Sequence, residues 1–170
     1  MPTPAFPPLR RRKQELSPEE AARVLEQAPY GVLATLGTDG YPYAVPLSFA
    51  YLDGRIVFHC APTGHKLDAL RANPRVSFTA VSHNEVVPHE YTNYYVSAIA
   101  FGTARIVEDD AEKRRLCRDF ALRYCEGLEA GVDEEVDKLI GRTAIVVIEI
   151  EHLSGKRAIE LVPPKEEKDA

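Results

Sequence analysis

The organisation of this chain is clearest in one segment, Val57-Phe58-His59-Cys60-Ala61-Pro62-Thr63-Gly64-His65-Lys66-Leu67. An apolar strand turns at Gly64 and enters a helix whose first turn carries His65 and Lys66. Two basic residues at a helix start are unfavourable by themselves, because the positive end of the helix dipole lies there. An anion bound between them makes the arrangement favourable, since free backbone N–H groups at the helix start also bind the anion. The segment predicts either a phosphate site or a solvated lysine beside a surface histidine.

Regular strand patterns surround this segment. Asp53-Gly54 is a hairpin signal, Gly102 predicts a bulge or bend within a long strand, and polar Ser82–Asn93 is expected to be a loop. The expected strands are Gly31–Leu36, Pro42–Leu52, Arg55–Ala61, Arg75–Val81, Tyr94–Glu108 and Thr143–Glu151.

Helix signals lie between the strands. Ser17-Pro18-Glu19-Glu20 is a capping box, which begins a helix that ends near Gln27. A second helix contains Leu67 and Leu70 and closes before Asn73-Pro74. After Asp109-Asp110, an apolar stripe runs from Leu116 to Leu128, and a shorter helix is expected near 133–140.

The order of these elements predicts a mainly β fold, a six-stranded antiparallel barrel with flanking helices. Residues 1–15 and 163–170 are expected to be flexible ends, and 16–162 to form a single domain.

Composition limits the function classes. The 170 residues are 45% hydrophobic and 28% charged, as in ordinary globular proteins, and no apolar run could span a membrane. A net charge of −5 argues against a nucleic-acid partner. Three cysteines do not make a disulfide framework, and two of them, Cys117 and Cys125, fall on the helical stripe and predict core positions. A reducing, cytoplasmic location is therefore expected, and the five histidines have no metal-site spacing.

The second strand offers a further candidate contact surface. It is apolar on both faces, and Pro46, which lacks a backbone donor, marks an edge or an irregular place. An exposed backbone edge beside an apolar wall suits a flat heteroaromatic ring, although the edge of an ordinary core sheet would have the same pattern.

Taken in order, these motifs resemble the FMN-binding split barrels of the pyridoxamine 5′-phosphate oxidase type, nearest the branch of the nitroimidazole-resistance reductases. The resemblance covers about residues 17–157. It rests on GVLAT 31–35, DGYP 39–42, VPLSF 45–49, FHCA 58–61, GHKL 64–67, NPRV 73–76, YVSAI 95–99, FG 101–102, IEI 148–150 and GK 155–156.

The resemblance implies a cofactor, its contacts and an assembly. The cofactor is FMN, held at the interface of a homodimer. Ala44, Val45, Pro46, Leu47, Ser48 and Phe49 supply backbone and wall contacts to its ring. His59 and Cys60 lie by the ribityl chain or phosphate, His65 and Lys66 hold the phosphate, and Ser97 reaches the flavin of the second subunit.

Three functions follow as hypotheses. The first is an FMN-dependent oxidoreductase that reduces a small, flat, electron-poor substrate; flavin carries the redox chemistry itself, so no catalytic constellation is needed. The second is a flavin-binding module without turnover. The third is a haem-binding split barrel with His59, His65, His83 or His89 as the iron ligand.

Overall fold

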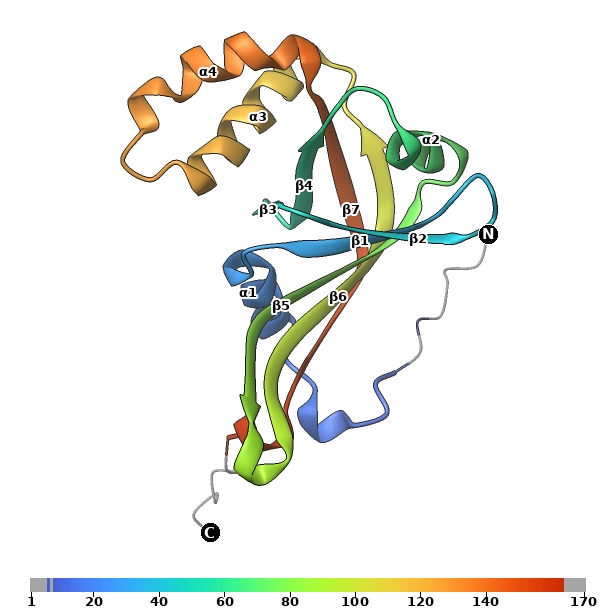
Figure 1. The fold of residues 1–170 in the computed structure, drawn as a ribbon, viewed down its shortest axis with the longest axis vertical. Helices are drawn as coiled ribbons and strands as arrows, with labels where there is room; N and C mark the ends of the chain where they lie inside the picture. The colour runs from blue at the N-terminus through green and yellow to red at the C-terminus, as the bar shows by residue number, and fades with distance from the viewer. Residues whose placement is uncertain (1–5, 7, 164–170) are drawn as a thin grey trace.

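The computed structural model describes residue 6 and residues 8–163. Within this part, a single antiparallel sheet of seven strands runs in the order β2-β1-β5-β6-β7-β4-β3 (Figure 1). The strands are β1 (Gly31–Leu36), β2 (Pro42–Leu47), β3 (Ala50–Leu52), β4 (Arg55–Cys60), β5 (Arg75–Val87), β6 (Thr92–Ile106) and β7 (Ala144–Arg157).

Four α-helices and five short 3₁₀ turns complete the described part of the fold. The helices are α1 (Pro18–Gln27), α2 (His65–Ala72), α3 (Asp110–Tyr124) and α4 (Val132–Leu139), and the 3₁₀ turns are η1 (Arg12–Gln14), η2 (Pro88–Glu90), η3 (Glu129–Gly131), η4 (Ile140–Arg142) and η5 (Ile159–Leu161).

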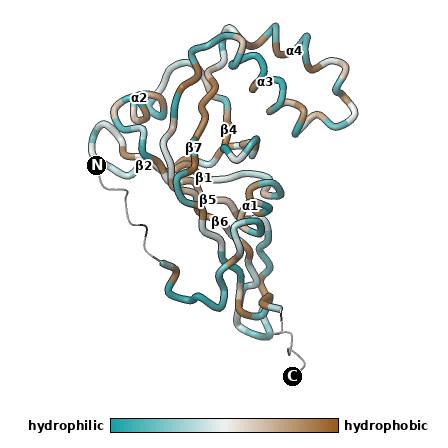
Figure 2. The backbone as a smooth tube through the Cα atoms, turned by 180° about the vertical axis from the view of Figure 1, so that it is seen from behind, coloured by the Kyte–Doolittle hydropathy of each residue, from teal (hydrophilic) through white to brown (hydrophobic). Residues whose placement is uncertain are grey.

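The sheet curls around a main core and carries a second, smaller core on its outside. Phe49, Phe58, Phe78 and residues of α1 fill the inside of the curl. On the other face of β4 and β7, Val57, Ile145 and Val147 pack under Leu116 of α3. The first part of β7, residues 144–148, therefore buries both faces, which accounts for its continuous apolar run and its hydrophobic colouring in Figure 2.

The expected antiparallel split barrel with flanking helices is confirmed, but the strand count of six is corrected to seven. The run Pro42–Leu52 is not one strand, because Ser48 and Phe49 separate β2 from β3. These two short strands lie at opposite ends of the strand order although they are almost contiguous in sequence. The break therefore joins the two edges of the curled sheet.

The expected loop over Ser82–Asn93 is wrong. Strand β5 continues to Val87, and β6 begins at Thr92, so both strands extend into a long hairpin that projects from the body (Figure 1). Its residues are polar because it extends beyond the core: from Ser82 to Asn93 only Val87 is buried. Polar composition here reflects exposure on both faces rather than absence of a strand. Strand β7 likewise runs to Arg157, past the expected end at Glu151.

The bulge predicted at Gly102 is present, as a shift of register between Phe101 and Gly102 in the β6–β7 ladder. A Cβ atom at position 102 would lie 2.1 Å from the carbonyl oxygen of Glu149. Only glycine permits this approach of the two backbones, and the bulge bends both long strands around the core.

The N-terminus of helix α1 is capped and is bound to the end of strand β7. The predicted capping box forms, with the Ser17 side chain accepting from the Glu20 N–H and Glu20 accepting from the Ser17 N–H. Glu20 also pairs with Arg157 at the end of β7. Just before the helix, Gln14 is buried and Glu15 bridges to Lys156, so packed structure begins before the expected boundary at residue 16.

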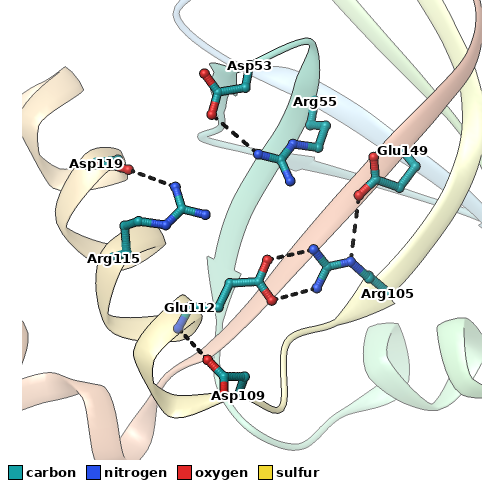
Figure 3. A network of polar contacts seen from close by, with 8 residues as sticks. All are labelled: Asp53, Arg55, Arg105, Asp109, Glu112, Arg115, Asp119 and Glu149. Atoms are coloured by element: carbon teal, nitrogen blue, oxygen red, sulfur yellow. Dashed lines mark hydrogen bonds and ion pairs between the residues drawn. The ribbon is translucent and has the colours of Figure 1, made fainter.

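Helix α3 is joined to the sheet by a polar network (Figure 3). Asp109 caps its first turn by accepting from the Glu112 N–H at 2.7 Å. The carboxylate of Glu112 forms a bidentate pair with Arg105 of β6, at 2.7 and 3.0 Å, and Arg105 also reaches Glu149 of β7. No helix in the described residues is long and apolar enough to cross a membrane.

Candidate functional site

The sheet does not close into a full barrel, and the opening is the candidate site. Strand β2 pairs with β1 on one side only. Strand β3 ends its pairing at Ala50 opposite Val57, so the rest of β4, Phe58–Cys60, pairs with β7 alone. Two strand edges therefore diverge from the Ser48–Phe49 junction with free backbone groups. We call this opening the split, bounded by β2, Phe58–Cys60 and the first turn of α2.

The first turn of α2 touches both sides of the split. His65 packs edge-on against Tyr43 of β2, with ring centroids 4.7 Å apart. The next residue, Lys66, places its Nζ atom 5.6 Å from the centre of the Phe58 ring in β4. Gly64 precedes them with a φ of 130°, a conformation that favours glycine, and no side chain within the described ranges caps the helix. The N–H groups of Leu67 and Asp68 bond to the Gly64 carbonyl. Those of His65 and Lys66 have no hydrogen-bond partner in the described part of the chain and lie beside the split.

Lys66 is a cation without a counter-ion: no carboxylate of the described residues lies within ion-pairing distance of it. Its side chain is half-buried. An unpaired, partly desolvated ammonium group beside free N–H groups is an arrangement that attracts an anion. The predicted location of His65 and Lys66 in a first helical turn is confirmed, whereas their role toward phosphate stays a prediction.

His59 and Cys60 point to opposite sides of β4, as adjacent strand residues must. His59 reaches solvent and packs edge-on against Phe120 of α3, with ring centroids 4.7 Å apart. Partial burial, and then the charge of Lys66, lower the pKa of His59. Cys60 packs against the main core, and burial raises the pKa of its thiol although Lys66 acts in the opposite direction. At neutral pH the site thus offers a neutral imidazole and a protonated thiol.

The β2 residues are placed differently from one another. Ala44, Pro46 and Ser48 are exposed, whereas Val45 and Leu47 pack against the main core. Phe49 is set apart: its ring is buried against Phe78, with centroids 4.8 Å apart. Its N–H and C=O are both bonded to the Tyr124 hydroxyl, at 3.1 and 2.6 Å. Phe49 and Tyr124 therefore fix the junction where the split begins, and the exposed β2 residues form its wall.

Ser97 is not brought to the split within one chain. It lies on β6, opposite Val81 and Lys156. Strands β1 and β5 separate β6 from β2. Three strand spacings, about 14 Å, therefore separate the strand of Ser97 from β2 at the split.

A large cavity adjoins the split and was not predicted from the sequence. It has a volume of about 800 Å³ and lies between α3, α4 and the ends of β4 and β7. Ser48 and His59 line it from the side of the split, Phe120, Tyr124 and Val136 line it from the helices, and Leu128 lines it from the segment between α3 and α4. Cys117 and Cys125, expected in the core, are half-buried and also line this cavity. The stripe on α3 was the available signal, but such a stripe also fits a closed core.

Comparisons with known proteins agree with this architecture. A family model described as pyridoxamine 5′-phosphate oxidase matches residues 17–157. No curated protein sequence matches the chain.

Solved structures share the fold. A protein provisionally assigned to 5-nitroimidazole antibiotic resistance, from Bacteroides thetaiotaomicron, has a TM-score of 0.70 at 21% identity, covering 84% of this chain and 86% of its own. An FAD-binding protein from Mesorhizobium loti has a TM-score of 0.63 at 29% identity, covering 85% and 97%. An FAD and haem binding protein from Mycobacterium smegmatis has a TM-score of 0.71 at 24% identity, covering 86% and 73%.

Proposed function

Because the chain belongs to the pyridoxamine 5′-phosphate oxidase family, we propose that it is a flavoprotein that holds FMN in the split and reduces a small, electron-poor substrate. One observation carries the proposal: the unpaired cation of Lys66 and the uncapped first turn of α2 lie between two strand edges with free backbone groups. An anionic group and a flat ring with hydrogen-bonding edges are the two halves of FMN that such a site suits.

Each residue of the split has a role in this proposal. Lys66 and His65 hold the phosphate, while Cys60 and His59 adjoin the ribityl chain. Ala44, Pro46 and Ser48 line the ring, and Val45 and Leu47 hold that wall against the core. The bound flavin carries hydride and electrons. The chain's own contribution is to orient the ring and to keep a neutral imidazole, His59, at the border between split and cavity.

The test compares flavin titrations of Lys66→Ala and Lys138→Ala. A charge-assisted contact contributes about 1.5–3 kcal/mol, so Lys66→Ala is expected to weaken FMN binding about tenfold or more. Lys138 pairs with Glu135 on α4 and serves as the control. Riboflavin, which lacks the phosphate, should bind both variants alike, and FAD is titrated in parallel. Equal FMN affinity in the two variants would remove the phosphate assignment.

Turnover separates an oxidoreductase from a flavin-binding module. The flavin-loaded protein is mixed with NADH or NADPH and with nitroaromatic or quinone acceptors, and the oxidation of the nicotinamide is followed. Acceptor-dependent oxidation supports the oxidoreductase. Stable flavin binding without any such oxidation favours the module.

A haem-binding protein is the second candidate, since His59 is the histidine that lines the large apolar cavity. His65 packs on Tyr43 instead, and His83 and His89 lie on the projecting hairpin. A Soret band in the purified protein that His59→Ala abolishes would favour this candidate. Flavin bands without a Soret band would favour the first.

We also propose that the protein is a homodimer formed through the outer face of the sheet. Residues directly opposite one another in neighbouring strands share a face, and two uncharged rows cross four strands there. The rows are Pro46-Val32-Thr79-Ile99 and Ala44-Ala34-Ser77-Phe101. Ala44, Pro46 and Ile99 in these rows are exposed and the other five residues are half-buried. An uncharged, partly exposed face of this kind commonly marks an interface. Ser97, opposite Val81, lies in the row next to the one that contains Ile99.

A further inference from the structure

We propose that the cavity between α3, α4 and the sheet is a binding site for an uncharged, apolar molecule of two or three aromatic rings. This inference deepens the proposed function and rests on it, because it makes the cavity the substrate pocket beside the flavin.

The first step is the chemistry of the cavity wall. Its lining side chains are mostly aromatic and aliphatic, and none of the described residues that line it is a lysine or an arginine. The one carboxylate in the lining, Glu135, is exposed and pairs with Lys138 at 3.1 Å. The one histidine, His59, is held toward its neutral form by burial and by Lys66. A phosphate or carboxylate would therefore find no cation here, and its desolvation would be uncompensated.

The second step is size. A volume of about 800 Å³ lies in the range of pockets that enclose drug-sized ligands. A single five- or six-membered ring would leave most of this space unfilled. Several rings would contact both helices at once, from Phe120 on α3 to Val136 on α4.

The third step is position. Ser48 and His59 belong both to the cavity wall and to the edges of the split. A molecule in the cavity would thus lie next to whatever occupies the split, with His59 and Ser48 offering it a hydrogen-bonding group at the border. Helix α4, which forms the outer wall, is packed mainly on α3 and stands away from the sheet (Figure 1). The pocket is therefore concave and reachable, as a small-molecule site must be.

Two fluorescent probes with one skeleton test the proposal. N-phenyl-1-naphthylamine is uncharged, and 8-anilino-1-naphthalenesulfonate carries an added sulfonate. We expect the neutral probe to bind the FMN-loaded full chain at least tenfold more tightly than the anionic one, because FMN then occupies the split and its cation, Lys66. Anionic binding of equal strength would overturn the requirement for an uncharged ligand.

Variants locate the probe. Ala121→Phe fills the cavity from α3 and should weaken binding of the neutral probe at least tenfold, whereas Ala111→Phe, exposed on the same helix, should not. Leu128→Asp adds a charge at an exposed lining position, 70% accessible, where folding is not at risk; Tyr91→Asp on the hairpin is its control. Unchanged probe binding in both cavity variants would overturn the site.

Measuring flavin binding beside probe binding distinguishes the cavity proposal from the flavin proposal. Ala121→Phe should still bind FMN, which also shows that it folds. Probe binding by a protein that takes up no flavin would preserve the cavity and reject the flavin function. Flavin binding without any probe binding would support the flavin function and reject the cavity site. If probe binding disappears as the protein concentration rises into the range of self-association, a second chain occupies the cavity and the small-molecule proposal fails.

Discussion

At the scale of single residues, His59 is the group whose protonation the site controls. Burial and the Lys66 charge lower its pKa below the ordinary value of 6.5. Lys66→Met removes the charge and should raise the pKa of His59, while Lys138→Met should leave it unchanged. The imidazole proton signals, followed by NMR against pH, measure both. A pKa of His59 that stays constant in Lys66→Met would show that the two groups do not interact.

The same shift has a consequence for stability. The unfolded chain binds a proton at His59 before the folded chain does, so stability from this group is present above pH 6.5 and is lost as the pH falls through the lower folded value. His59→Gln should therefore lose less unfolding free energy between pH 7 and pH 5 than the natural chain. Denaturant unfolding at the two pH values measures the difference, and parallel losses in both proteins would contradict it.

Gly102 is a residue whose side chain is excluded by a neighbouring backbone. Gly102→Ala places a Cβ atom 2.1 Å from the Glu149 carbonyl oxygen, and backbone atoms cannot move away cheaply. We expect a loss of about 1–3 kcal/mol in unfolding free energy. At Gly141 a Cβ atom would meet nothing within 4 Å, so Gly141→Ala is the control. Equal unfolding midpoints would show that the ladder adapts.

Two features of single residues could be predicted from the residue types alone. The bulge at Gly102 and the basic pair at the start of α2 follow from local rules about glycine and the helix dipole. The link between Phe49 and Tyr124 could not be predicted in this way. Their contact joins residues 75 positions apart, and the tyrosine lies on a stripe that local rules assign to the core.

At the scale of elements, helix α3 is fixed to the sheet by the Arg105–Glu112 pair. The hydrogen bonds that Arg105 donates to the Glu112 carboxylate lower the pKa of Glu112. Glu112→Gln should reduce the unfolding free energy at pH 7 by up to about 1 kcal/mol, the value of a well-oriented but partly exposed pair. The effect exists above the ordinary glutamate pKa of 4.5 and should disappear as the pH falls through the lower folded value.

Thermal unfolding of Glu112→Gln and Glu134→Gln at several pH values measures this effect. Glu134 is exposed on α4 and takes part in no ion pair among the described residues. A destabilisation of Glu112→Gln that persists at low pH would indicate lost packing rather than a lost charge pair.

Element boundaries were predictable where caps and turns are local. The capping box of α1, the Asp109 cap of α3 and the Asp53-Gly54 turn all form where the sequence indicates. The hairpin between β5 and β6 was missed because strand patterns depend on one buried face, and this hairpin has almost none. The division of Pro42–Leu52 was missed because closure of the sheet, a non-local event, decides where that strand breaks.

At the scale of the whole molecule, the proposed homodimer would bring residues of a second chain to the split. Ala44 and Pro46, at the split, belong to the uncharged rows on the outer face, and Ser97 lies beside those rows three strands away. A twofold axis through this face would bring the partner's copy of this region toward the split. We therefore expect sedimentation equilibrium to give about twice 18.9 kDa. FMN should stabilise the dimer by about 2.7 kcal/mol for each of its two sites at one hundred times the dissociation constant.

A mixing experiment tests whether Ser97 acts across the interface. Ser97→Ala and Lys66→Ala are each expected to weaken FMN binding in homodimers of one variant. If Ser97 serves the partner's site, a mixed dimer has one site with both defects and one with neither. Random mixing then restores natural affinity at about a quarter of all sites. If Ser97 serves its own chain, each site of the mixed dimer keeps one defect and no high-affinity fraction appears. A monomer that binds FMN with full affinity would exclude both the dimer and the contact made by Ser97.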